Sequence, residues 1–454
     1  MDQRESRGTE RGGELDEIPG DHINRLPDDL LCAIISLLPT KDAGRTPAVS
    51  PRWRNLWRSA PLSLVIHSPV NPHSPSSVDP SAVSTIVSRH DGPTRRFFFR
   101  GGVLGPQAED WFRSRALASL QELDIKLLPA QPGARFPLPP SALSSPSLLV
   151  VQIAYCSIPV PDEILTAMDF PLLKHISLLH VTISGDVFHG LLSACRALES
   201  LYVSNVDAAG CLRVTSPTLR SIAISKEFRG KSELIIEDAP HLVRFLLPYA
   251  YGRDGDKCVA IRVVRAPKLE VLGPLFLVIS RILVSQSQGI SPGSSANSMR
   301  NVKVLALRCA GQELDEVLNV LRWFPCLEKL YIVFHGQREM DMNNEPPCNG
   351  LHQVECLQDH LKTVVFKAFV GHENQVNFAR FFVINGRVLN KIEFEGWFID
   401  YSSTSLGYRQ NQLHAGNRAS QDAKFEFRQY INPQRRLQEH IHDLSVADPF
   451  QTTI

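Results

Sequence analysis

Residues 289–293 read Gly-Ile-Ser-Pro-Gly and match a pattern that can carry out nucleophilic catalysis. In this G-x-S-x-G pattern, a strained turn between a strand and a helix exposes the serine at the helix start. The flanking residues are Ser-Gln-Ser-Gln before and Ser-Ser-Ala-Asn-Ser after, which provide neither the strand nor the helix. We therefore predict an exposed loop, and a serine hydrolase at Ser291 is kept only as a contrasting hypothesis.

Four side chains of zinc-ligand type recur at four-residue steps: Cys348, His352, Cys356 and His360. On an α-helix each such step turns the side chain by about 40°, so the first and last would point about 120° apart. Tetrahedral zinc requires ligands that converge on one point. The spacing therefore predicts loop and helix-surface residues, and we expect no metal ion, no other cofactor and no catalytic residue.

Residues 21–62 combine a dense run of aliphatic side chains with two tryptophans near the end. Leu30, Ile34 and Leu37 recur at three- and four-residue steps, so they share one face of a predicted helix. A segment this short has more large apolar residues than it can hide. We therefore expect part of it to be buried against something outside the segment.

Prolines delimit the helices predicted within residues 21–62. The two aspartates after Pro27 suit a helix start, because carboxylates complement the exposed N–H groups there. Ser50 can cap a later helix in which Pro51 takes the first position, where no hydrogen-bond donor is lost. Pro47 falls near the end of the predicted second helix and would cost ~3 kcal/mol if that helix continued through it. Gly44 in the same helix adds a smaller penalty.

The same segment resembles the F-box, a short three-helix module that docks a Skp-type adaptor of a cullin ubiquitin ligase. The resemblance rests on Leu26-Pro27, on the Pro-Thr-Lys-Asp corner at residues 39–42, and on Trp53 with Trp57. It implies that this segment holds the ligase while the rest of the chain holds a substrate. Some of the implied adaptor-binding residues would also build the module's own small core. The full set of implied adaptor-binding residues is Leu26, Pro27, Leu30, Leu31, Ile34, Leu38, Val49, Trp53 and Trp57.

A repeat of the form apolar-x-x-apolar-x-apolar begins after about residue 115 and determines the predicted architecture. Its first positions are 28, 25, 25, 21, 23, 27, 33 and 25 residues apart, at or near the 20–29 residues of leucine-rich repeats. The alternating last positions suit a short strand with one buried face. We predict a solenoid in which each repeat covers its neighbour's apolar face. The copies are Leu120/Leu123/Ile125, Leu148/Val151/Ile153, Leu173/Ile176/Leu178, Leu198/Leu201/Val203, Leu219/Ile222/Ile224, Leu242/Phe245/Leu247, Leu269/Leu272, Val302/Leu305/Leu307 and Leu327/Leu330/Ile332.

A second pattern lies between some of these copies, at residues 212–219, 236–242 and 261–269. Each is an apolar strand followed by Pro-x-Leu, in which the proline would end one ladder before the next strand begins. The polar residues 285–298 interrupt the array as a predicted loop and explain the 33-residue spacing. A second polar break at residues 336–350 is a candidate domain boundary.

Beyond residue 350 the pattern changes to strand, helix and strand. Residues 361–366 and 389–394 repeat the apolar strand pattern, and residues 376–383 between them form a helical face that ends at Asn385-Gly386. The segment resembles the FBD region found near the C-terminus of many plant F-box/leucine-rich-repeat proteins. The resemblance implies that the three regions belong to one such protein.

Composition limits the environment and the kinds of partner. The 48 basic and 47 acidic residues balance, so neither nucleic acid nor a membrane is expected as the main partner. Nine cysteines are scattered without a dense framework, which fits a reducing compartment. Residues 1–20 lack the apolar core of a signal peptide, and residues 271–284 are too short to span a bilayer. We expect a soluble intracellular protein, cytoplasmic, nuclear or both.

The predicted fold is therefore α/β, with an N-terminal three-helix F-box, an irregular leucine-rich-repeat solenoid and a C-terminal α/β FBD-like region. Its expected parts are a disordered tail (1–20), the F-box (21–62), a linker and start of the solenoid (63–114), the solenoid (115–335), the FBD-like region (350–430) and a C-terminal tail (431–454). The resemblance implies a non-catalytic substrate receptor of a Skp–cullin–F-box ubiquitin ligase. The alternative is a repeat scaffold that binds proteins but whose F-box is degenerate.

Overall fold

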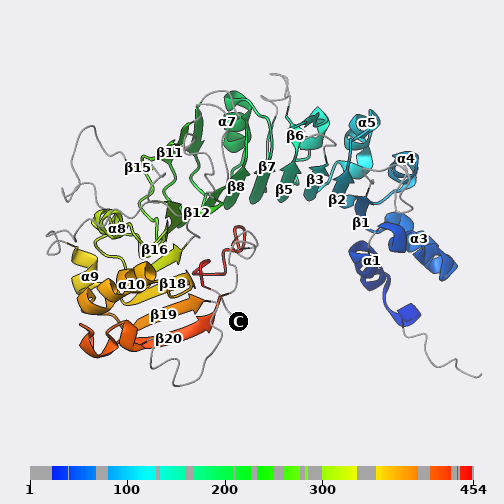
Figure 1. Cartoon of the computed structure of the whole chain (residues 1–454). Coiled ribbons are helices and arrows are strands. Elements are labelled where there is room, and N and C mark those ends of the chain that lie inside the picture. Colours follow the sequence, from blue (N-terminus) through cyan, green and yellow to red (C-terminus); the bar gives the residue numbers. More distant parts are fainter. Residues whose placement is uncertain are drawn as a thin grey trace, which may run out of the picture.

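A computed structural model gives the structure of the chain (Figure 1). It describes residues 23–38, 40–67, 80–128, 133–158, 168–207, 211–225, 233–249, 260–276, 282–284, 299–334, 354–396, 410–430, 437 and 440–451. Residues 1–20 and 285–298, predicted as a tail and a loop, lie outside these ranges, as does Ser291.

One parallel sheet of 14 strands forms the curved body of the molecule (Figure 1). Each strand pairs with the next strand of this sheet along the chain, so the order in the sheet follows the order in the sequence. The strands are β1 (Leu62–His67), β2 (Thr94–Gly101), β3 (Glu122–Leu127), β5 (Val150–Ala154), β7 (His175–Leu179), β8 (Ser200–Ser204), β10 (Ser221–Ser225), β12 (Arg244–Tyr249), β14 (Val271–Phe276), β16 (Val304–Cys309), β17 (Lys329–Phe334), β18 (Thr363–Phe369), β19 (Lys391–Gly396) and β20 (Lys424–Gln429).

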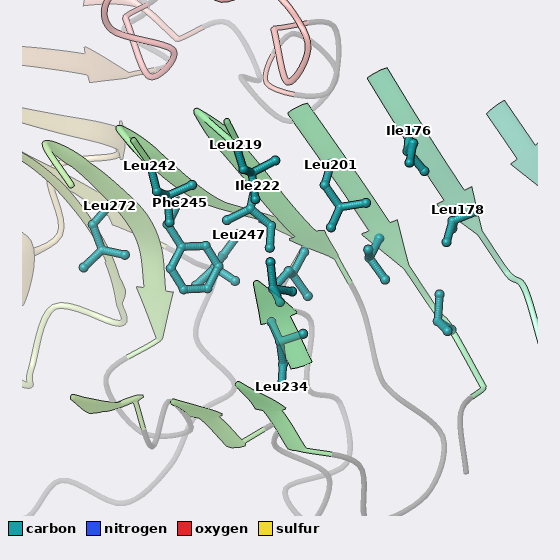
Figure 2. Packing of buried hydrophobic residues seen from close by; sticks show 14 of the residues in the cluster. Ile176, Leu178, Leu201, Leu219, Ile222, Leu234, Leu242, Phe245, Leu247 and Leu272 are labelled. Carbon is teal, nitrogen blue, oxygen red and sulfur yellow. The ribbon is translucent and has the colours of Figure 1, made fainter. Parts of the chain in front are cut away.

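The predicted repeat sets the register of this sheet. Val151 of β5 pairs with Ile176 of β7, which pairs with Leu201 of β8. Leu305 and Leu330 continue the same position on β16 and β17. These side chains are buried and stack from strand to strand in the main core, part of which is seen in Figure 2. The predicted solenoid is therefore confirmed, since each repeat covers its neighbour's apolar face.

The outer side of the solenoid is built differently in its middle than at its ends. Helices cover it at both ends, whereas in the middle the second predicted pattern forms a separate parallel sheet of four strands. Leu234 pairs there with Leu212, and Ile236 with Val214, so this pattern has its own ladder instead of ending the main one. The four strands are β9 (Leu212–Thr215), β11 (Glu233–Asp238), β13 (Ala260–Val263) and β15 (Ile282–Val284).

The remaining elements lie in the connections between strands. The α-helices are α4 (Pro80–Arg89), α5 (Ala108–Arg113), α7 (Gly185–Ala194), α8 (Leu314–Leu321), α9 (Glu355–Asp359) and α10 (Glu373–Asn385). The short 3-10 turns are η3 (Arg115–Leu117), η4 (Pro140–Leu143) and η6 (Ala415–Asn417), and a two-stranded sheet joins β4 (Phe136–Pro137) to β6 (Cys156–Ser157).

The FBD-like region continues the solenoid. The predicted strand, helix and strand are β18, α10 and β19. Lys329 of β17 pairs with Thr363 of β18, so the main sheet continues from the repeats into this region, while the candidate boundary at 336–350 lies outside the described residues. On β17, β18 and β19 the side chains that enter the main core alternate in the same way, and any strand with this pattern can extend the stack. They are Leu330/Ile332, Val364/Phe366 and Ile392/Phe394.

The N-terminal helices are joined directly to the first strand. Thr40 Oγ1 donates to the Ser63 carbonyl over 2.8 Å and accepts from the Val65 N–H over 2.6 Å. Thr40 thus satisfies backbone groups at the free edge of β1. Residues 63–114, predicted to include a linker, contain β1 and β2 in the regular sheet, while residues 68–79 lie outside the described part. The helical elements are η1 (Ile23–Arg25), α1 (Asp28–Leu37), α2 (Thr40–Ala43), η2 (Thr46–Ala48) and α3 (Pro51–Ser59).

A second contact fixes this joint from the other side. Trp57 of α3 packs edge-on against His90, with ring centroids 5.3 Å apart. His90 Nε2 lies 2.9 Å from the Ala60 carbonyl, and burial lowers the pKa of His90. Gly92 approaches the end of α3 so closely that a Cβ atom would lie 2.5 Å from the Ser59 carbonyl oxygen. The helices and the solenoid are therefore packed together, not tethered.

Residues 437 and 440–451 lie on the inner face of the main sheet, which we define as the face opposite the main core. Figure 1 shows this part of the chain, in red, within the curve of the solenoid. Leu437, Ile441 and Phe450 are buried there with inner-face side chains such as Tyr202 and Leu246. The described part of the predicted C-terminal tail therefore packs on the sheet.

Candidate functional site

The helices of residues 23–60 form a small core of their own. Leu31 and Ile35 of α1 are 0% and 1% exposed, and Trp53 and Leu56 of α3 close over them. The four-residue step from Leu31 to Ile35 places both on one side of α1. This core holds one face of α1 inward and leaves the opposite face outward.

Arg52 fastens the start of this region to α3. Its guanidinium donates to the Asp28 carboxylate over 2.8 Å and to the Leu26 carbonyl over 2.7 Å. The neighbouring Trp53 donates from Nε1 to Asn24 Oδ1 over 2.6 Å. These bonds to η1 and to the first turn of α1 keep the outer face of α1 in a fixed orientation.

The outer face of α1 presents large apolar side chains to solvent. Leu37 is 84% exposed and Leu30 is 52% exposed, and both lie on α1. Val49, after η2, is 57% exposed, and Ile23 of η1 is also exposed. Exposed leucines are ordinary one at a time, but a group on one small module marks a surface that binds a partner.

The structure separates the predicted adaptor-binding residues by exposure. Leu30, Pro27 and Val49 are exposed, and Leu31 and Trp53 are buried inside the helices, where they support the module and cannot meet a partner directly. The half-buried members of the predicted set are Leu26, Ile34, Leu38 and Trp57.

Two exposed apolar residues, Ile23 and Leu37, were absent from the predicted set. Leu37 lies seven residues after Leu30, two helical turns along the same face, so the helical period carries the information needed to find it. Ile23 lies in a single 3-10 turn, for which the sequence has no comparable period.

The predicted cost of Pro47 does not arise. α2 ends at Ala43, and Pro47 lies at the start of the separate turn η2, where no helical hydrogen bond is lost. Gly44 follows the end of α2 and donates from its N–H to the Thr40 carbonyl over 2.9 Å. The predicted start of α3 is correct, with Ser50 as its N-cap and Pro51 in the first position.

Of the predicted zinc-type residues, Cys348 and His352 lie outside the described part of the chain. Cys356 lies in α9 and is buried, and this burial raises the pKa of its thiol to about 12. A thiol with this pKa stays protonated near neutral pH, which disfavours both metal ligation and nucleophilic attack. In the described part of the chain, no group of three or more His, Cys, Asp or Glu side chains could hold a metal ion.

Three family descriptions match successive parts of the chain. The F-box domain matches residues 23–64, the leucine-rich repeats of the FBD-associated F-box protein At5g56370 match residues 108–332, and FBD matches residues 351–394. The matched F-box contains the exposed face of α1, and the other two matches cover most of the main sheet. The fold and these matches define an F-box protein with a leucine-rich-repeat solenoid.

Curated relatives from Arabidopsis thaliana carry similar descriptions. The chain is 24% identical to F-box/FBD/LRR-repeat protein At5g56420 over 80% of this chain and 88% of the relative. It is 24% identical to F-box/FBD/LRR-repeat protein At3g26920, over 82% and 89% of the two chains. It is 26% identical to the putative FBD-associated F-box protein At5g56390, over 71% and 79%. The chain therefore has F-box, leucine-rich-repeat and FBD regions, and its homologues are F-box/FBD/LRR-repeat proteins, as the sequence predicted.

None of the helices that the structure describes is both long and apolar enough to cross a membrane.

Proposed function

We propose that this chain is a substrate-recognition subunit of a Skp–cullin–F-box ubiquitin ligase. Its F-box region binds a Skp-type adaptor, and its solenoid and FBD region bind a protein substrate. The F-box match and the relatives support the adaptor role in general terms. We further propose that the chain acts inside the cell, where such an adaptor and a cullin are found.

The exposed apolar face of α1 is the observation that carries this proposal. Leu30 and Leu37 are held outward by a packed core and by the Arg52 bonds, so they form a rigid apolar surface before any partner arrives. Burying apolar area gives about 25 cal/mol per Å², so a few such side chains can dominate the affinity. We expect Val49 and Ile23, which are exposed on the same module, to add to this contact.

The proposed role involves no chemistry by the chain itself. It brings a substrate close to the ligase, and ubiquitin transfer belongs to the partners. The high pKa of the buried thiols agrees with this role, since burial also raises the pKa of Cys156, Cys195 and Cys309 to about 12.

The test is adaptor binding by the full chain carrying Leu30→Asp and Leu37→Asp. Both side chains are mostly exposed, so the variant should fold, and its thermal midpoint should stay within a few degrees of the original. We expect at least a hundredfold loss of affinity for a Skp-type adaptor, measured by calorimetry. Val103→Asp and Val370→Asp form the matched control, because both are half-exposed valines in the solenoid region.

Equal adaptor affinity of the double leucine variant and the control would overturn the proposed docking face. Failure of the folded, unaltered chain to bind any Skp-type adaptor would favour the alternative, a protein-binding scaffold with a degenerate F-box.

A further inference from the structure

The inner face of the solenoid is covered by the chain's own end. We call residues 437 and 440–451 the C-terminal strap. Figure 1 shows it against the central strands, and Figure 2 shows part of the main core on the opposite side of these strands. The strap lies across the strands from β7 to β18, where Val365 belongs to the same buried cluster as Leu437, Ile441 and Phe450.

At its first end the strap is held by a cluster of imidazoles and hydroxyls. The two ring nitrogens of His442 lie 2.7 Å from Ser177 Oγ on β7 and 2.5 Å from Ser200 Oγ on β8. His175 Nδ1 lies 2.8 Å from the same Ser200 hydroxyl, and its ring is 5.4 Å from that of His442. This cluster binds one particular side chain of the strap.

In the middle, the sheet recognises the strap's backbone. Arg244 of β12 donates from Nη1 to the carbonyls of Asp443 and Val446 over 3.0 and 2.9 Å. Ser221 of β10 donates to the Ile441 carbonyl over 3.2 Å. Any chain outside a regular helix or sheet, such as the turns and bends of the strap, offers free carbonyls, so this part of the surface is suited to peptides in general.

At the far end the strap presents an acidic and an aromatic group. Asp448 accepts from Lys329 Nζ over 2.7 Å and from the Tyr331 hydroxyl over 2.8 Å. Phe450 packs edge-on against the Tyr331 ring, with centroids 5.6 Å apart. These contacts select a carboxylate followed, two residues later, by an aromatic ring.

The strap does not fill this surface completely. A small pocket remains between strap and sheet, lined among others by Ala306, Tyr331, Val333, Leu437 and Phe450. The strap itself pairs with no strand of the sheet in the described residues, so each hydrogen bond that attaches it involves a side chain on at least one side. A segment held in this way can leave without disturbing the parallel ladder.

We propose that the inner face from β7 to β18 is a binding surface for a segment of a partner protein that adopts turns and bends, as the strap does. That segment carries an aliphatic residue and, seven residues later, Asp-Pro-Phe, as the strap does at Ile441 and Asp448–Phe450. The strap occupies the surface in cis and is exchanged for the partner's segment. The inference rests on the proposed function only in taking this partner to be the substrate.

Tethering makes the strap a strong competitor, because a short linker gives a local concentration in the millimolar range. A free segment of equal intrinsic affinity therefore binds the unaltered chain weakly. Weakening the strap should expose the surface and reveal its affinity.

The test uses a fluorescent synthetic peptide with the sequence of residues 437–451 and the full chain carrying Asp448→Ala and Phe450→Ala. We expect this chain to bind the peptide at least tenfold more tightly than the unaltered chain, by fluorescence anisotropy. A peptide that carries the same two alanines should bind at least tenfold more weakly than the original peptide. Adding Tyr331→Phe and Lys329→Ala to the strap-weakened chain should also weaken binding at least tenfold.

Equal binding of the peptide to the strap-weakened and unaltered chains, or equal binding of the two peptides, overturns the inference. Hydrogen exchange on the unaltered chain gives an independent test that needs no variant. The strap amides should exchange faster than those of β8, β10 and β12, and exchange of strap and strands only together would overturn it.

The same proteins separate this inference from the proposed function. If the strap-weakened chain does not bind the peptide but the unaltered chain binds the adaptor, the inference alone is overturned. If the unaltered chain does not bind the adaptor but the strap-weakened chain binds the peptide, the proposed function alone is overturned.

Discussion

The outer face of α1 and the inner face of the solenoid gather apolar side chains in opposite ways. Leu30 and Leu37 on α1 are open to solvent, whereas Tyr202 and Leu246 on the inner face are covered by Ile441 and Phe450 of the chain itself. Binding a partner on the outer face of α1 gains the free energy of burying that whole apolar surface. Binding on the inner face gains only the difference in free energy between the partner's contacts and the strap contacts that are lost.

This difference makes the two proposed binding events separable. Docking on α1 requires no rearrangement of the described residues, so its affinity depends on the module alone. Binding on the inner face is an exchange, so its apparent affinity depends on how firmly the strap is held.

The largest predicted effect tests whether the strap keeps water away from the inner face. Lys367 of β18 lines the pocket between strap and sheet together with Leu437 and Phe450. Its ammonium lies 2.8 and 2.7 Å from the two carboxylate oxygens of Glu395, and the two side chains are 1% and 4% exposed. Glu395→Gln leaves the lysine charge buried without its counter-charge, which costs about 3–5 kcal/mol. Urea unfolding should show this loss.

The exposed pair Lys362–Glu328, with a separation of 2.9 Å, is the matched control. Glu328→Gln should cost at most about 1 kcal/mol, because solvent screens the exposed pair. Similar losses in the two variants would show that the strap does not keep water from the inner face.

The next effect separates the two sides of α1. Leu31→Ala removes a fully buried side chain from a small core and should cost about 2–5 kcal/mol of unfolding free energy. Leu37→Ala on the exposed side should change it by less than about 0.5 kcal/mol. Thermal unfolding of the two full-length variants measures the difference, and equal losses would contradict the exposed docking face.

A third prediction concerns the effect of pH on docking of the strap. Burial, with the nearby His175 and Arg244, lowers the pKa of His442 to about 4, from 6.5 in the free side chain. As pH falls below 6.5 the free strap takes up a proton that the docked strap excludes, so docking weakens until pH reaches about 4. The limit is tenfold in affinity per pH unit for one such group.

We expect His175 to act in the same direction, because burial lowers its pKa despite the opposing charge of Glu199 and the docked His442 ring lies against it. We expect the peptide of residues 437–451 to bind the strap-weakened chain most tightly above pH 6.5 and progressively less tightly down to pH 4. A peptide with His442→Asn should show a clearly smaller pH dependence, due to His175. An unchanged pH dependence with that peptide would exclude His442 as its source.

The sequence was enough to predict the solenoid because its determinants recur. Leu123, Val151 and Ile176 occupy equivalent positions of successive copies, and the same alternation of buried residues that identifies each copy also sets its register in the sheet. The helix before Gly386 and the start of α3 were predicted for a similar reason, since the local sequence contains both the apolar period and the end residue.

The joint and the strap could not be predicted because their determinants are not local. Thr40 looks like an ordinary helix-start residue, and nothing nearby indicates that its hydroxyl caps the edge of β1. Ile441 and Phe450 have no period, and Arg244, which binds the strap, lies about 200 residues earlier. The small inner-face residues Ser221 and Ala223 carry one usable indication, because they alternate with Ile222 and Ile224, and small side chains on one face of a strand leave room for another chain.

The packed joint between α3 and the first strands has a geometric consequence for the proposed complex. With Thr40, Trp57 and His90 all holding it, the adaptor-docking face and the inner face keep a constant separation and angle. The chain would then fix the position of a bound protein relative to the adaptor. Among the lysines of a bound protein, only those at the matching radius and direction would come within reach of the transferred ubiquitin, so the stiffness of one short corner would select the site of modification.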